Sequence, residues 1–460
     1  MIFIRKDQLN MTEGPFLKKL VVFALPVLLT GFLQLLYNAA DLIVVGQFAT
    51  SDAQGAIQST GALINLIVNV SLGLAVGVNV AVAKYIGAQD ENAVSKVVHT
   101  GLILSLIIGV FIAAFGFFQA HYFLELMNSA PELVELSTLY LKIFFLGTPL
   151  NLFYNFGAAA LRAKGETQKP LFYLFVSGAI NVALNLFFVL VLDMDVDGVA
   201  IATITSQGIS AVLVFIELKK TRGYCRIYVK KLKIDGGALK EILQIGLPAG
   251  VQGSMFSISN VLIQSTINTF GKVVVTANGN ATSLEGFMYI AVDCVYQAAL
   301  AFIGQNYGAN RKENIKKVMR ETFFMVTLLC AVLAAVMIPL RRVFLSVYNT
   351  DPEIISNGEL RMLINVTTYF LFGWMQIFVA YLRGMGHGVL PVIVSVLGVC
   401  VFRIVWIYTV FPLWPTLISI YLSYPISWAI TALAHFICHK LTEKKSYERM
   451  NAEALARVYS

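Results

Sequence analysis

Long runs of apolar residues, separated by short polar stretches, make up most of this chain. Twelve runs have the length of about 20 residues that a helix needs to cross a bilayer, at 17–45, 56–83, 95–118, 136–159, 171–192, 197–218, 242–269, 276–304, 319–340, 360–381, 390–411 and 416–438. Residues 1–16 are polar, and the run after them is too long for a signal-peptide core. The pattern predicts an all-α membrane protein with twelve transmembrane helices.

Short motifs recur in the same order in the two halves of the chain. The four residues Leu161, Arg162, Gly165 and Pro170 recur as Leu382, Arg383, Gly386 and Pro391. The same spacing relates Gly87-Ala88 to Gly308-Ala309, and one residue more relates Leu25-Pro26 to Leu247-Pro248. Several separated matches in one order indicate an internal duplication.

The duplication predicts two six-helix lobes. Because six is even, both lobes have the same orientation, and we expect a pseudo-two-fold axis along the membrane normal. The expected boundaries are an N-terminal lobe over 1–218, a basic linker over 219–240, a C-terminal lobe over 241–440 and a tail over 441–460. Transporters built in this way bind their cargo between the lobes near the bilayer midplane.

A polar stripe follows one face of the first predicted helix. Its members are Gln34, Tyr37, Asn38 and Asp41, at the spacing of neighbours on a helical face. A charge at the centre of a membrane helix costs about 2.5–3.5 kcal/mol, so the stripe predicts a wet cavity. The alternative is an aspartate at the outer end of the helix.

Other predicted helices carry polar pairs four residues apart, at Asn65 and Asn69, Asn151 and Asn155, and Asn181 and Asn185. Each pair alone is typical of contacts between membrane helices. Together with Asp41 they favour a hydrophilic chamber in the first lobe. The eighth run carries Glu285, Tyr289, Asp293 and Gln297 on one face, which predicts attraction of a cationic solute. The alternatives are a membrane-end position for Glu285 and pairing of Asp293 with Arg403.

Composition excludes a soluble enzyme, because 58% of the residues are apolar and 13% charged, with a mean hydropathy of +0.75. Of the 34 lysines and arginines, 28 fall on the side that holds the termini, Lys142 and Arg403 fall inside predicted spans, and only Lys272, Arg341, Arg342 and Arg361 fall on the other side. This distribution predicts cytoplasmic termini in the inner (plasma) membrane. Because the positive charges are spread over many loops, we expect no nucleic-acid partner. The five scattered cysteines are expected to be small buried apolar residues.

The chemistry that these residues suggest is ion exchange rather than catalysis. A carboxylate in a drier setting takes up a proton more easily, so Asp41 could exchange a proton for a cationic compound. The same carboxylate, with asparagine and threonine oxygens, could instead hold sodium. The chain has no phosphate-binding loop and no zinc-protease motif, and His435 and His439 have no further histidine or cysteine ligand nearby except Cys438, which favours an interfacial position for them. We expect no enzyme activity, no cofactor and no other metal.

Several of these motifs resemble those of the multidrug and toxic compound extrusion (MATE) family, over residues 14–440. They are FALPVLLTGFLQLLYNAADLIVVGQF, GAINVALNLFFVLVLDMDVDGVAIATITSQ, FIGQNYGA and the paired Leu-Arg-x-x-Gly turns. The resemblance implies a V-shaped, rocking two-lobed transporter that exports organic cations or amphipathic compounds in exchange for protons or sodium. It also implies that Asp41, Asn181 and Thr203 belong to an ion site, and that Gln34, Tyr37 and Asn38 contact drugs.

The chain departs from the family pattern at two places. Similar members often have an aspartate where this chain has Asn185, and the glutamate of another branch is missing after Pro248. We therefore assign Asp41, Asn181, Asn185 and Thr203 to ion coupling. To substrate binding we assign Gln34, Tyr37, Asn38, Asn151, Asn155, Glu285, Tyr289 and Asp293. We expect the protein to be a monomer. The alternative to multidrug export is a flippase for a lipid-linked saccharide, and a third function considered is that of a membrane-embedded enzyme.

Overall fold

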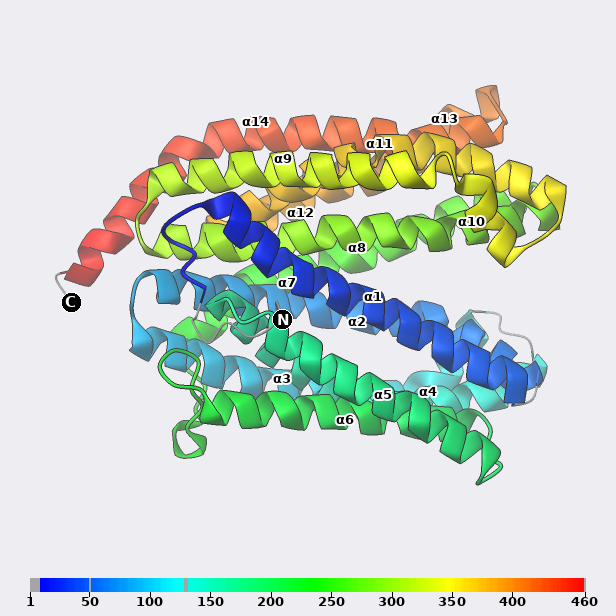
Figure 1. Cartoon of the computed structure of the whole chain (residues 1–460), viewed down its shortest axis with the longest axis horizontal. Helices are drawn as coiled ribbons and strands as arrows, with labels where there is room; N and C mark the ends of the chain where they lie inside the picture. The colour runs from blue at the N-terminus through cyan, green and yellow to red at the C-terminus, as the bar shows by residue number, and fades with distance from the viewer. Residues whose placement is uncertain (1–8, 49–50, 128–130, 459–460) are drawn as a thin grey trace. The chain divides into compact units, whose positions relative to one another are not determined.

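The computed structural model describes residues 9–48, 51–127 and 131–458, and it contains helices and no strand in these ranges. Figure 1 shows the long helices. Those of the first half are α1 (Phe16–Phe48), α2 (Ser51–Gly87), α3 (Glu91–Leu126), α4 (Pro131–Lys164), α5 (Gln168–Leu190) and α6 (Val196–Lys220). The second half contains α7 (Gly236–Asn268), α8 (Lys272–Gly308), α9 (Lys312–Met337), α10 (Arg341–Tyr348), α11 (Pro352–Gly384), α12 (Val389–Ser395), α13 (Phe402–Thr409) and α14 (Leu417–Val458). Short helical turns are η1 (Val229–Lys231), η2 (Val396–Val401) and η3 (Phe411–Leu413).

The prediction of an all-α membrane protein is confirmed. Within the described ranges, 11 segments are long and apolar enough to cross a membrane, and α12, η2, α13 and η3 together form one of them. The remaining predicted span is α7, whose 33 residues include several serines, glutamines and asparagines in its second half. These polar residues lower its hydropathy although its length is sufficient.

The helices form two compact units, and the division differs from the boundaries expected from the sequence. Unit 1 consists mainly of residues 29–250, and unit 2 of residues 10–28 and 251–458. The reason is that α1 and α7 each contribute to both units, and each divides two residues after a proline, Pro26 or Pro248. The segment expected as a tail, 441–460, continues α14 as far as Val458.

The same packing pattern occurs in each unit, as expected of a duplication. In unit 1, α4 packs against α2, α3 and α6, and in unit 2, α11 packs against α8, α9 and α14. The first turns of α1 belong to unit 2, where Phe16 and Phe23 pack edge-on against Phe302 with centroids 6.4 and 5.9 Å apart. In each unit, three long helices therefore pack around one central helix.

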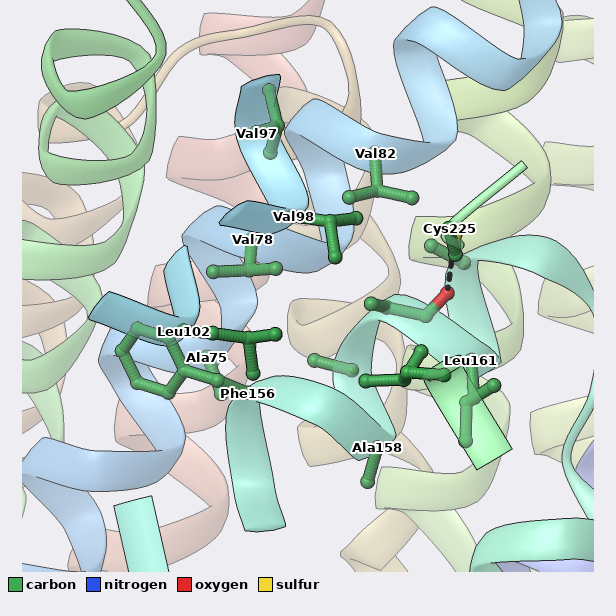
Figure 2. Close-up of a cluster of buried hydrophobic side chains, with 14 of the residues drawn as sticks. Ala75, Val78, Val82, Val97, Val98, Leu102, Phe156, Ala158, Leu161 and Cys225 are labelled. Carbon is green, nitrogen blue, oxygen red and sulfur yellow. Dashed lines mark hydrogen bonds between the residues drawn. The ribbon is translucent and has the colours of Figure 1, made fainter. Parts of the chain in front are cut away.

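The core of unit 1 extends into the linker between α6 and α7 (Figure 2). Cys225 of the linker is buried, and its Sγ lies 3.7 Å from the carbonyl oxygen of Ala160. The backbone N–H of Tyr228 donates to Nε2 of His99 on α3, at 3.0 Å. Burial raises the pKa of the Cys225 thiol to about 12, so this side chain acts as a small apolar group. The linker is therefore part of the packed fold.

Small residues let α2 and the first half of α7 approach at backbone distance. Gly73 and Gly77 face Gly246 and Gly250, and a Cβ added at Gly73 would lie 2.2 Å from the backbone nitrogen of Gly250. Each pair has the Gly-x-x-x-Gly spacing that permits close packing of membrane helices. Contact of this kind excludes any side chain at Gly73 and Gly77.

We expect Gly73→Val to separate the two helices and sharply reduce the yield of folded protein. The displaced atoms are backbone, so the clash cannot be relieved by a rotamer change. The matched control is Gly61→Val on the same helix, where an added Cβ meets nothing within 4 Å. Fluorescence-detected size exclusion and thermal unfolding in detergent would measure both variants. Equal yields would show that the glycine contact is dispensable.

Candidate functional site

Asp41, on the second half of α1, lies among helices of unit 1. Neighbouring residues Val44 and Val45 join a core cluster with Tyr140 of α4, Val189 of α5 and Val199 of α6. The Asp41 carboxylate accepts a hydrogen bond from the amide nitrogen of Asn185, which is fully buried on α5. The predicted acidic residue thus faces the packed helices of its unit.

The two α5 asparagines join the same polar group. The Asn185 amide nitrogen also lies 3.4 Å from Oδ1 of Asn181, one turn away on the same helix. Oδ1 of Asn185 is buried and has no hydrogen-bond partner among the described residues. Asp41, Asn181 and Asn185 therefore form a cluster with oxygen atoms available to a small cation.

No positive charge neutralises this cluster within the described part of the chain. Asp41 takes part in none of the ion pairs there, and no group of three or more histidine, cysteine, aspartate or glutamate side chains is found that could hold a transition metal. A single partly buried carboxylate with amide neighbours suits a proton or a monovalent cation held by oxygen.

Tyr37 fixes the polar stripe of α1 against α5. Its hydroxyl donates to the carbonyl oxygen of Phe175 at 3.2 Å, and its ring lies directly over Gly178, where a Cβ would be about 2 Å from the ring. Gln34 is exposed on the same stripe. The side chain of Asn38 lies outside the described part of the structure. Glycine at position 178 is therefore required by the tyrosine ring.

The other predicted site residues of the first lobe form hydrogen bonds within their own helices. Asn155 donates to Oδ1 of Asn151 at 2.9 Å within α4, so this pair does not bridge two helices. The Thr203 hydroxyl donates to the carbonyl oxygen of Val199 in its own helix, at 3.0 Å. This bond leaves the Thr203 oxygen lone pairs available as acceptors.

In unit 2, Glu285 of α8 forms a buried ion pair with Arg361 of α11. Two guanidinium nitrogens of Arg361 each donate to one carboxylate oxygen at 2.8 Å. Asn365 donates to the same carboxylate at 3.0 Å, and Asn278 accepts from Arg361 at 2.6 Å. The prediction that counted Arg361 among the outer-loop charges is wrong, because this residue is buried within α11.

Asp293 and Tyr289 lie further along the same face of α8. Asp293 accepts from the side-chain amide of Gln297 one turn away. Arg403 donates to Ser427 at 2.9 Å, so the alternative in which it pairs with Asp293 is not observed. The Tyr289 ring is half-exposed and packs against Phe372 with centroids 6.1 Å apart.

Sequence reasoning missed the partners of Glu285, although a signal for them existed. Arg361 and Asn365 are four residues apart, and Asn278 and Glu285 are seven apart, so each pair shares a helical face. The aromatic neighbours of Arg403, which are Tyr424 and Trp428, were also missed. Their spacing of four residues on α14 was the available signal.

Comparison with known proteins points to one family. The family model described as MatE matches residues 26–187 and again residues 248–409. The probable multidrug resistance protein YoeA of Bacillus subtilis is 26% identical over 391 residues, which are 83% of this chain and 84% of that protein. The multidrug export protein MepA of Staphylococcus haemolyticus is 22% identical over 376 residues, or 82% and 83% of the two chains. A structure of a multidrug resistance MATE family transporter in its outward-facing conformation has a TM-score of 0.89, with 21% identity over 97% of this chain and 100% of that one.

Proposed function

This chain belongs to the MatE family of multidrug efflux transporters, and we propose that it exports small amphipathic organic compounds in exchange for a monovalent cation bound at Asp41. The relatives named as multidrug resistance and export proteins support this cargo class. We place both termini in the cytoplasm and the chain, as a monomer, in the plasma membrane. Neither enzymatic chemistry nor a cofactor is needed for such an exchange.

The isolation of Asp41 is the observation that carries this proposal. A carboxylate that is even partly buried and has no positive partner is costly in a membrane unless it serves a purpose. Here it has only an amide donor from Asn185 among the described residues. A group in that state gains free energy by binding a cation and can therefore alternate between two charge states during a cycle.

Exchange follows from the linkage of two binding events. If the ion and the cargo each weaken the binding of the other, then uptake of the ion on one side releases the cargo there. An inward ion gradient then drives cargo outward. The membrane potential contributes about 2.3 kcal/mol for each charge moved across 100 mV. A single carboxylate predicts one monovalent cation in each cycle at this site.

The choice between proton and sodium defines the test. We expect purified protein in lipid vesicles to move ethidium in response to only one of two gradients, either of pH or of sodium, when each is applied alone. Imposing both gradients in turn, with the membrane potential clamped by valinomycin and potassium, identifies the coupling ion. If neither gradient nor potential moves ethidium or a fluoroquinolone, the proposed exchange is wrong.

A further inference from the structure

Arg403 is a buried arginine of unit 2 that lies between aromatic rings. It belongs to α13, and only 4% of its surface is exposed. Its guanidinium lies 4.1 Å from the ring centroid of Tyr424 and 5.7 Å from that of Trp428, both on α14. Its Nε donates to the Ser427 hydroxyl at 2.9 Å. Three residues of one helix therefore fix the orientation of this side chain.

The charge of Arg403 is not neutralised by any carboxylate among the described residues. Its Nε has an acceptor there, whereas its two terminal nitrogens have none. The other buried arginine on the Tyr424 ring is Arg361, at 5.2 Å, and Glu285 already neutralises it. The cluster thus carries one excess positive charge. A buried charge of this kind is expected to have an anionic partner.

The two matches to the family model align Arg403 with Asn181 of the Asp41 cluster. The two segments that match the family model begin 222 residues apart, at 26 and 248, and end 222 residues apart, at 187 and 409, whereas the Leu161/Leu382 and Pro170/Pro391 matches are 221 apart. The offset of 222 relates Asn181 to Arg403, and it relates Asp41 and Asn185 to Ile263 and Ile407. Ile263 and Ile407 pack in one apolar cluster, just as Asp41 and Asn185 are bonded to each other. At the positions matched by the offset of 222, unit 2 therefore has Arg403 and two isoleucines where unit 1 has Asn181, Asp41 and Asn185.

The backbone before Arg403 is irregular as well. Residues Val396–Val401 form a π-helical turn that leads directly into α13. Such turns are rare and occur frequently at functional sites, because they change the direction of the residues that follow. This observation is independent of the charge and supports a binding role at this position.

We propose that Arg403, with Ser427 and the rings of Tyr424 and Trp428, binds the carboxylate of an aromatic compound. A guanidinium can donate two parallel hydrogen bonds to a carboxylate, and its free terminal nitrogens are the groups that do so. Aromatic side chains beside it can stack on a planar ring. The inference rests on the proposed export function and deepens it: it names Arg403 as the group that binds the carboxylate of aromatic acids and zwitterions among the cargo.

The test compares a fluoroquinolone that has a free carboxylate with its ethyl ester. Binding to the purified full-length protein in nanodiscs would be measured by fluorescence titration, for wild type, Arg403→Gln and Arg403→Lys. We expect Arg403→Gln to weaken binding of the acid by about 10–100-fold, the usual effect of losing hydrogen bonds to a charged group, with little change for the ester. Arg403→Lys keeps the charge without the planar fork and should give an intermediate loss.

The matched control is Arg320→Gln, which makes the same substitution at an exposed arginine of α9 and should change neither affinity. If Arg403→Gln does not fold, Arg403→Lys decides the question through its acid-to-ester ratio. If the ratio of acid affinity to ester affinity is unchanged in the folded variants, the inference is wrong. It is also wrong if pyrophosphate or chloride competes for Arg403 and the aromatic acid does not. Ethidium, which lacks a carboxylate, tests the export function separately, so failure of one proposal does not imply failure of the other.

Discussion

Replacement of Asp41 by asparagine is expected to abolish ion-driven efflux while the protein remains folded in the membrane. Asparagine has the same shape, and its side-chain oxygen can still accept the hydrogen bond from Asn185. It cannot take up a proton and offers sodium no negative charge. Transport of ethidium by Asp41→Asn vesicles should therefore fall to the level of protein-free vesicles under either gradient.

The control for this experiment is Asp193→Asn, which removes an exposed acid between α5 and α6 and should leave efflux at the wild-type level. Binding of ethidium without a gradient should survive in Asp41→Asn, because the cargo is then no longer in competition with an ion. Full gradient-driven efflux by Asp41→Asn would remove Asp41 from the coupling mechanism. Loss of folded protein would instead show that the carboxylate has a structural role.

The fold followed from the sequence because its main signal is local. A run of about 20 apolar residues predicts a transmembrane helix wherever it occurs, and the recurrence of Leu25-Pro26 as Leu247-Pro248 revealed the duplication. The contribution of α1 and α7 to both units could not be predicted in this way. Hydropathy identifies a span, but it does not show which helices the two ends of that span contact.

The candidate sites were predictable in part, for the same reason. The stripe that contains Asp41 was visible because its members lie on one helix. Its partner Asn185 is 144 residues away, and the separation of Glu285 from Arg361 is 76 residues. Pairing over such distances depends on helix packing, which no single-sequence pattern encodes. Glu285 therefore looked like a free acid for a cationic solute, whereas the structure gives it a fixed partner.

Neutralisation of Glu285 is expected to affect stability more than cargo binding. Glu285→Gln leaves the Arg361 guanidinium buried with only 5% of its side chain exposed and without a countercharge. Removal of one member of a buried ion pair typically costs about 3–5 kcal/mol of unfolding free energy. We expect a correspondingly large fall in the thermal midpoint in detergent. The matched control, Glu353→Gln at the exposed start of α11, should leave the midpoint unchanged.

A double-mutant cycle can distinguish a structural role of the Glu285–Arg361 pair from a role in cargo binding. Arg361→Gln should be destabilising for the converse reason, and Glu285→Gln combined with Arg361→Gln should cost much less than the sum of the two single changes. Asn278 and Asn365, which bond to the pair, would then face neutral amides that can both donate and accept. A stable Glu285→Gln protein with weakened ethidium binding would contradict this expectation. It would mean that the carboxylate serves the cargo and that Arg361 releases it when the cargo binds.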